Sequence, residues 1–186
     1  LLSETLNILN TEVAGYYMFG GTDAVDTPVA AMDAILNGSG SLDGLRTYMS
    51  EYAEANLGAS NTGRTTISAL TTNYVPGPGP SDSTFTIAED GAHDFGFDIA
   101  SVNSTLSNVA ITGPGGTDPD SFDVQFTDQP NLGETISIEL SLPPDHTETI
   151  TMEFTAATTN EEEGSFVIGA DLEETAQNLR DAIAAE

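Results

Sequence analysis

Apolar residues recur at helical spacing near both ends of the chain. Near the start they are separated by four, three and four positions, and the same spacing returns near the end. This spacing places side chains on one face of a helix and also forms the seam of a coiled coil. We expect helices over 1–13 and 172–185 to lie side by side in one bundle; ordinary amphipathic helices that pack on a globular core are the alternative. The seams are Leu2, Leu6, Leu9 and Val13, and Leu172, Ala176, Leu179 and Ile183.

Residues with strong preferences for helix ends bound these two helices. Gly15 is predicted to end the first helix, because glycine readily adopts the left-handed conformation that follows a helix. Asp171 is predicted to cap the start of the closing helix, because an aspartate side chain can accept hydrogen bonds from the first free N–H groups. Apolar spacing predicts two further helices, over 29–36 and 42–57.

Between these helices, apolar and polar residues alternate with a period of two. Such alternation predicts β-strands with one buried face. Turn residues, mainly Gly, Pro, Asn and Asp, separate the alternating segments, which favours a small sandwich or an open antiparallel sheet. The predicted strands are Ser83–Ala88, Asp94–Ala100, Leu106–Thr112, Ser121–Thr127, Thr135–Leu142, Thr147–Ala156 and Gly164–Ile168.

A run of alternating proline and glycine over 75–80 precedes the first predicted strand. Such a run fits neither a helix nor a central strand, so we interpret it as a linker between domains. The predicted fold class is α+β. A helical bundle segment, made of the terminal heptad helices plus one or two return helices, carries an inserted antiparallel β-rich domain. The bundle domain comprises 1–73 and 170–186, and the inserted domain comprises 74–169.

The segment after the first seam reads GYYMFGGT and continues to DTPV at 26–29. A helix followed by these segments resembles the flagellin and hook-filament junction (hook-associated protein 3) family, in which a long helix runs into a GRYLFGG-like segment. The resemblance covers the first 35 residues closely and the last 20 loosely. Tyr16 stands where that family usually has a basic residue. The strand-to-helix stretch 166–179 also resembles flagellin-like proteins of alphaproteobacteria, although phage tail proteins carry the same pattern.

The resemblance implies a structural subunit that is exported through the channel of the flagellum itself and is located outside the cell. It implies assembly contacts through Tyr16, Tyr17, Met18 and Phe19, together with the seam residues Leu2, Leu6, Leu9, Val13, Leu172, Leu179 and Ile183. Other flagellar subunits are the expected partners. The 186-residue chain by itself is expected to be a monomer, because its charge opposes association at low salt.

Composition narrows the range of partners. The chain has thirty acidic residues, three arginines and no lysine, which gives a formal charge of −27. Binding to nucleic acid or to anionic lipid relies on Lys and Arg, so neither is an expected partner. The acidic surface also fits a saline habitat, where salt screens the self-repulsion. The absence of cysteine removes disulfides and thiolate catalysis from consideration.

The sequence carries little that indicates catalysis. His93 and His146 each have acidic neighbours, but neither belongs to a zinc or triad motif, and we interpret both as surface residues. Asp118, Asp120 and Asp123 lie close together, yet they do not follow an EF-hand pattern, so calcium binding is an open alternative to a charged turn. No cofactor is expected.

We therefore expect a structural subunit of the bacterial flagellum, either of the filament or of the hook-filament junction, rather than an enzyme. The alternative is a surface-binding or carbohydrate-binding β module of an adhesin or a phage tail protein. That alternative explains the β-rich middle and the acidity, but not the paired seams. A hydrolase is the third hypothesis, and the scarcity of histidine and the absence of cysteine and lysine weigh against it.

Overall fold

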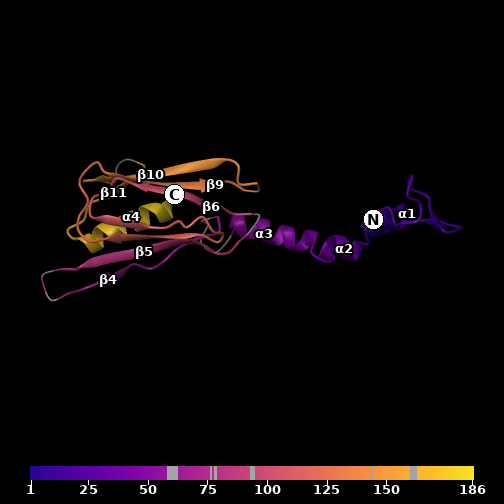
Figure 1. Cartoon of the computed structure of the whole chain (residues 1–186), viewed down its shortest axis with the longest axis horizontal. Helices are drawn as coiled ribbons and strands as arrows, with labels where there is room; N and C mark the ends of the chain where they lie inside the picture. The colour runs from indigo at the N-terminus through magenta and orange to yellow at the C-terminus, as the bar shows by residue number, and fades with distance from the viewer. Residues whose placement is uncertain (58–62, 76, 78, 93–94, 144, 160–162) are drawn as a thin grey trace. The chain divides into compact units, whose positions relative to one another are not determined.

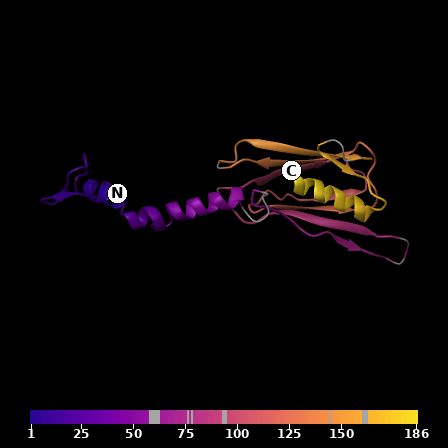
Figure 2. The same cartoon turned by 180° about the vertical axis from the view of Figure 1, so that it is seen from behind.

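The computed structural model describes the whole chain except residues 58–62, 76, 78, 93–94, 144 and 160–162 (Figures 1 and 2). Its internal contacts divide the chain into two compact units, Leu1–Tyr52 and Ala53–Glu186. Within the described residues, no helix has both the length and the apolar character that crossing a membrane requires.

The first unit consists of short elements joined by turns. It contains the helix α1 (Leu2–Leu9), the strands β1 (Glu12–Val13) and β2 (Tyr16–Tyr17), and the helix α2 (Met32–Asn37). The helix α3 (Leu45–Leu57) begins in this unit. The predicted first helix is therefore too long, because it ends at Leu9 and the chain then forms a hairpin.

The turn of this hairpin explains the early helix end. Val13 pairs directly with Tyr16, so Ala14 and Gly15 form a two-residue loop. Both have positive φ, 55° and 87°, which is the conformation of the type I′ turn that matches the twist of a β-hairpin. Gly15 thus turns a hairpin rather than ending a helix. Asn10 secures the end of α1, because its side chain exchanges two hydrogen bonds with the backbone of Val29, at 2.9 and 3.1 Å.

The second unit is a sandwich of two β-sheets. One sheet has the order β11-β10-β9-β6, and the other has the order β3-β5-β8-β7, with β4 also paired to β5. Neighbouring strands are antiparallel except β10 and β11, which are parallel. The strands are β3 (Thr65–Ile67), β4 (Thr71–Asn73), β5 (Asp82–Glu89), β6 (Asp98–Ser104), β7 (Val109–Thr112), β8 (Ser121–Phe126), β9 (Thr135–Ser141), β10 (Thr149–Ala157) and β11 (Ser165–Val167).

The period-two pattern correctly identified the buried faces of the central strands. On β8 and β9, every second residue is fully or almost fully buried, and the residues between are less so. On β10 the alternation holds at Phe154 and Ala156, but Ile150 near its start is 39% exposed. The buried residues of these three strands join one core, namely Phe122, Val124, Phe126, Ile136, Ile138, Leu140, Phe154 and Ala156.

The closing helix α4 (Leu172–Ala185) lies between the two sheets (Figures 1 and 2). It contacts β10 and β11 of one sheet and β5 and β8 of the other. Its start is as predicted, because the Asp171 side chain accepts the N–H of Glu174 at 2.9 Å. Its seam is buried in the core of the sandwich, with Ala176 and Leu179 both at 0% exposure.

A buried polar contact also fixes the start of α4. Thr175 is fully buried, and its hydroxyl lies 2.6 Å from the side-chain oxygen of Gln129 in the β8–β9 connection. The same hydroxyl accepts the N–H of Gly169 at 2.8 Å. A buried hydroxyl with both partners satisfied avoids the cost of an unpaired polar group and fixes one arrangement of these segments.

The predicted fold class, a helical bundle with an inserted antiparallel β domain, is wrong. The helices are short, with 8, 6, 13 and 14 residues, and β-strands make up most of the regular structure after α3. The seam of α4 packs against sheets and not against another helix. A four-three-four spacing shows that one helix face is apolar, but it does not show what covers that face. Two strands, β3 and β4, also lie where mainly helical structure was expected.

The proline-glycine run has a local role. Asn73, the last residue of β4, pairs with Asp82, the first residue of β5, and the N–H of Ser81 donates to the carbonyl of Asn73 at 2.7 Å. The segment therefore connects two paired strands of one sheet within the second unit, and Pro76 and Pro78 lie outside the described residues.

The packing of α4 can be tested by truncating Leu179. We expect Leu179→Ala to lower the free energy of unfolding by about 2–5 kcal/mol, because the change leaves a cavity in a closed core. Leu132 is 62% exposed, so the control Leu132→Ala should change stability by less than about 0.5 kcal/mol. Denaturant unfolding followed by circular dichroism measures both. Equal losses in the two variants would contradict the burial of α4 between the sheets.

Candidate assembly surface

The residues with the family resemblance lie on the β1–β2 hairpin and directly after it. Two backbone hydrogen bonds hold the segment in place: the N–H of Tyr17 donates to Ala24 at 2.7 Å, and that of Met18 donates to Thr11 at 3.0 Å. Tyr16, Met18 and Phe19 are 61%, 64% and 54% exposed, and Tyr17 is half-buried. The backbone is thus fixed while most of the large side chains face outward.

The seam of α1 differs from that of α4. Leu6 is buried, Leu9 is half-buried, and Leu2 and Val13 are 49% and 57% exposed. A helix of 8 residues has too few turns to be stable by itself, so its stability depends on tertiary contacts. Leu6 is thus covered, whereas Leu2 at the start of α1 is exposed, and Val13 is exposed and lies in β1 rather than on the helix.

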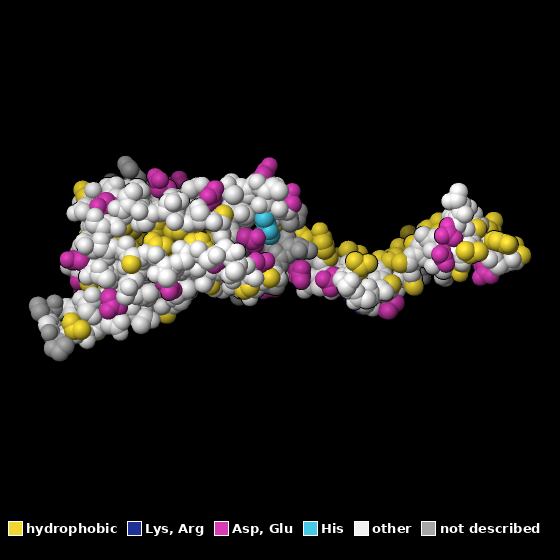
Figure 3. Space-filling view, in the orientation of Figure 1, with side chains coloured by type: hydrophobic (Ala, Val, Ile, Leu, Met, Phe, Trp, Pro, Cys, Tyr) yellow, Lys and Arg dark blue, Asp and Glu magenta, His cyan; other side chains and the backbone are white. Residues whose placement is uncertain are grey.

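The first unit, all of whose residues the structure describes, has an unusually apolar surface (Figure 3). Leu6 is its one large hydrophobic side chain that is buried. Fourteen exposed large hydrophobic residues lie in this unit, against four in the described part of the second unit. Single exposed hydrophobic residues are normal, but a concentration of this kind is typical of a surface that another protein covers. We define these residues as the assembly surface: Leu1, Leu2, Ile8, Val13, Tyr16, Met18, Phe19, Val25, Met32, Leu42, Leu45, Tyr48, Met49 and Tyr52.

Two of the three aspartates considered for calcium, Asp120 and Asp123, have separate structural contacts. The buried carboxylate of Asp120 accepts the backbone N–H groups of Gly115, Ser121 and Gly116 at 2.8, 2.7 and 2.5 Å. These bonds, that from Gly115 above all, lower the pKa of Asp120 below its ordinary value. Asp123 accepts the hydroxyl of Thr86 at 2.6 Å. In the part of the chain that the structure describes, no group of three or more acidic or histidine side chains is arranged to hold a metal ion.

Near Asp120, a second carboxylate connects the two sheets. Glu89 at the end of β5 accepts the N–H of Ile99 in β6 at 2.6 Å and that of Asp120 at 2.5 Å. Burial raises the pKa of Glu89 above its ordinary value, although these two hydrogen bonds act in the opposite direction. Burial likewise raises the pKa of Asp98, and the neighbouring His146 opposes that rise. The Glu89 carboxylate has a structural role, because it satisfies backbone groups of both sheets.

His146 has a defined environment, whereas His93 lies outside the described residues. The His146 Nδ1 atom is 2.7 Å from Asp98 Oδ2, and its Nε2 atom is 3.4 Å from the carbonyl of Gly96. Both ring nitrogens thus have partners within the fold. The histidine connects the β9–β10 loop to β6, and none of these contacts involves a serine or threonine nucleophile.

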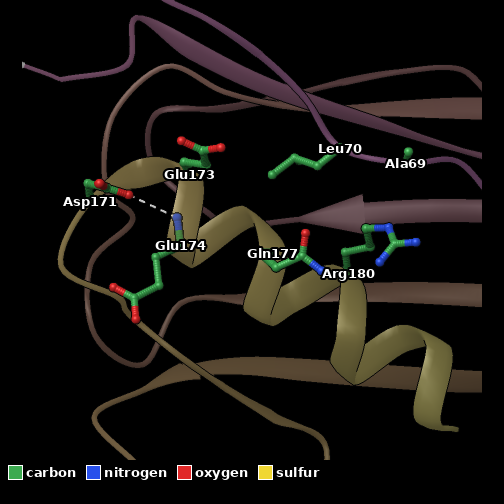
Figure 4. A pocket seen from close by; sticks show the side chains of 7 residues that line it. All are labelled: Ala69, Leu70, Asp171, Glu173, Glu174, Gln177 and Arg180. Carbon is green, nitrogen blue, oxygen red and sulfur yellow. Dashed lines mark hydrogen bonds between the residues drawn. The ribbon is translucent and has the colours of Figure 1, made fainter.

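A polar groove runs along the exposed side of α4 (Figure 4). It has a volume of about 600 Å³ and is lined by Ala69, Leu70, Asp171, Glu173, Glu174, Gln177 and Arg180. Arg180 Nε donates to the carbonyl of Ser68 at 2.7 Å, and Tyr74 donates to Glu173. That bond, with burial and the charge of Glu173, raises the pKa of Tyr74. Beyond the Asp171 cap, nothing in the sequence indicated this groove, because the β3–β4 segment that forms its other wall was assigned to the mainly helical bundle domain.

Comparison with protein-family models, with curated proteins and with solved structures finds no match to this chain. The assembly surface is therefore interpreted from its own residues and from the resemblance of the hairpin segment.

The carboxylates predict how stability depends on pH. Glu134 accepts hydrogen bonds from the side chain and backbone of Ser107 and Asn131, which lower its pKa from 4.5 to about 2. Because its pKa is lowered, the ionised Glu134 stabilises the fold at pH values above its ordinary pKa. This contribution is lost as the pH falls towards 2. Asp120 acts in the same direction. Glu89 and Asp98 have the opposite effect on stability. Their raised pKa values mean that ionisation of these residues destabilises the fold, and protonation in mild acid removes that destabilisation.

We expect Glu134→Gln to flatten the loss of stability between pH 4.5 and about 2 relative to the unmodified chain. Thermal unfolding measured across this range tests the expectation. The matched control is Glu153→Gln, at an exposed position of β10. A Glu134→Gln curve that is parallel to that of the unmodified chain over the whole window would contradict the assignment.

Proposed function

We propose that this chain is a structural subunit of the bacterial flagellum, in the filament or at the hook-filament junction, and that it acts by assembly and not by catalysis. The observation that carries the proposal is the assembly surface. In the first unit, large apolar side chains are exposed while the unit buries almost no core of its own. Covering such side chains releases about 25 cal/mol per Å² of apolar area, so contact with other subunits is favourable.

The hairpin supports the same proposal by a separate argument. The segment that resembles the flagellin and hook-filament junction family exposes two aromatic residues, Tyr16 and Phe19. Aromatic side chains are enriched at the centres of protein interfaces because they bury a large area at a small entropic cost. Tyr16, Met18 and Phe19 are the contact residues that we infer for a neighbouring subunit.

In this proposal the sandwich is the domain that faces the medium outside the cell. Its own core is complete, so its folding needs no partner. Its acidic surface limits non-specific association, as suits a domain that is displayed at high density. The proposed partners are other flagellar subunits. Nucleic acid and membranes are not proposed partners, because the chain has few basic residues with which to bind phosphate groups.

A second candidate is a surface-binding or carbohydrate-binding β module of an adhesin or a phage tail protein. One observation favours it: α4 packs within the sandwich, as expected if the terminal helix belongs to the β domain. The groove along α4 offers acidic and amide side chains that could bind hydroxyl groups of a sugar. This candidate leaves the exposed surface of the first unit unexplained, so we rank it second.

The proposal predicts the effect of two polar substitutions on the hairpin. The double variant Tyr16→Ser with Phe19→Ser should be exported but should fail to assemble. The reason is that the loss of two interface aromatics usually weakens binding by several kcal/mol, about 2 or more for each hot-spot residue. Complementation of a strain that lacks the gene, with swimming motility and electron microscopy of filaments as readouts, measures the effect.

The matched control carries the same number of polar substitutions on the sandwich, at Leu132→Ser and Ile150→Ser, which are also exposed. We expect this control to swim normally. Normal filaments with the hairpin variant would refute the proposed role of the hairpin. Equal defects in both variants would show a general loss of folding or export. Retention of a glycan by the chain, abolished by changes in the α4 groove, would favour the second candidate.

A further inference from the structure

The edge strand β7 has unpaired backbone groups. β7 is the last strand of the five-stranded sheet and pairs with β8 alone. The carbonyl of Asn108 accepts the N–H of Thr127 at 2.9 Å, so Asn108 faces β8. Because alternate residues of an antiparallel strand face its partner, Ala110 does so too, and the peptide groups of Val109 and Ile111 point outward. Among the described residues, no hydrogen bond to these outward groups is present.

Both edges of the four-stranded sheet are protected. On β6, the pairing shifts between Ile99 and Ser101, and the outward N–H of Ile99 donates to Glu89 at 2.6 Å. On β11, the carbonyl of Val167 accepts a hydrogen bond from Asn178 of α4 at 2.9 Å. Bulges, charged side chains and covering helices are the usual means by which proteins block unwanted strand pairing. β7 has none of these, so its edge is open.

β7 also lies in the longest uncharged segment of an acidic chain. Thirty acidic residues are distributed over 186 positions, yet 99–117 contains no charged residue. The side chains of Val109 and Ile111 are partly buried against the core, while Ala110 and Thr112 are exposed. The edge therefore presents free backbone groups beside small, neutral side chains.

We propose that β7 pairs with β7 of a second copy of this chain, antiparallel about a two-fold axis at Ala110. In this register, Val109 of one copy exchanges two N–H···O bonds with Ile111 of the other, and the symmetry repeats the exchange. Ala110 of one copy lies opposite Ala110 of the other. This pair is in the close, non-hydrogen-bonded position, where a small side chain fits. The paired edges form one continuous sheet, and the partly buried Val109 and Ile111 become more covered.

Charge selects a second copy as the occupant. Two chains that each carry −27 repel one another, and the repulsion is weakest where neither surface carries a charge, as at β7. A cationic partner would gain more from the acidic surfaces than from this neutral edge. On the neighbouring strand, the closest charge is that of Asp123, which pairs with Thr112 and bonds to Thr86. The remaining repulsion acts over a distance that salt shortens, so the association should require salt.

This contact does not rest on the proposed flagellar function, because it involves the sandwich and not the assembly surface. Its test uses the 186-residue chain in solution, whereas the flagellar proposal is tested in cells. Either can therefore fail without the other.

The experiment measures the oligomeric state by sedimentation equilibrium at about 0.05 M and about 2 M sodium chloride, which span weak and strong screening. We expect a monomer at low salt and a dimer at high salt. Ala110→Glu should weaken the dimer at least tenfold, because it places like charges opposite each other at the axis. The control Thr151→Glu adds the same charge at an exposed position of the central strand β10 and should leave the dimer intact.

A charge pair makes the test specific. Ala110→Arg should also fail to pair with itself, while an equal mixture of Ala110→Glu and Ala110→Arg should restore a dimer of one copy of each. Circular dichroism establishes that all variants are folded, as expected for substitutions at an exposed position. A monomer at both salt concentrations would overturn the proposal. A dimer that Ala110→Glu does not weaken would also overturn it, since association would then occur through another surface.

Discussion

The fold of the second unit depends on the burial of one face of α4 between two sheets. Ala176 and Leu179 are fully buried there, and the core that they join includes side chains from both sheets. Two sheets that face each other at a distance of about 10 Å are normally filled by their own side chains. Here a helix that contacts both sheets also contributes, through Leu172, Ala176, Leu179 and Ile183. The Asp171 cap and the Thr175–Gln129 contact act on the same helix, because they fix where it begins.

The carboxylates of this acidic chain have two roles. Some, such as Glu89, Asp120 and Glu134, accept backbone N–H groups that strand ends and turns leave unpaired. A charged acceptor makes a stronger hydrogen bond than a neutral one. These carboxylates therefore satisfy the backbone N–H groups of loops that have no other acceptor. The remaining acidic residues give the surface its charge. That charge opposes association, so the neutral edge at β7 and the exposed apolar side chains of the first unit stand out.

The two units differ in how much of their apolar surface they bury. The sandwich buries its large side chains within the chain, whereas the first unit exposes most of its own. A segment of 52 residues has a high ratio of surface to volume, which limits the size of the core that it can enclose. The structure of its backbone is nevertheless specific, through the type I′ turn at Ala14 and Gly15 and the contact between Asn10 and Val29. A defined backbone with uncovered apolar side chains is suited to assembly.

The sequence by itself determined the local elements of the sandwich. Period-two alternation located β8 and β9 to within a residue, and the Asp171 cap gave the start of α4, because burial of one face and satisfaction of helix ends are local requirements. Only the tertiary structure decided what covers each face. The same four-three-four spacing is buried on α4 and largely exposed on α1, since spacing reports that a face is apolar and not which surface it meets. The short strands β3 and β4 were not predicted, because their pairing to β5 depends on residues distant in the chain. The free edge of β7 became apparent only from the order of strands in the sheet.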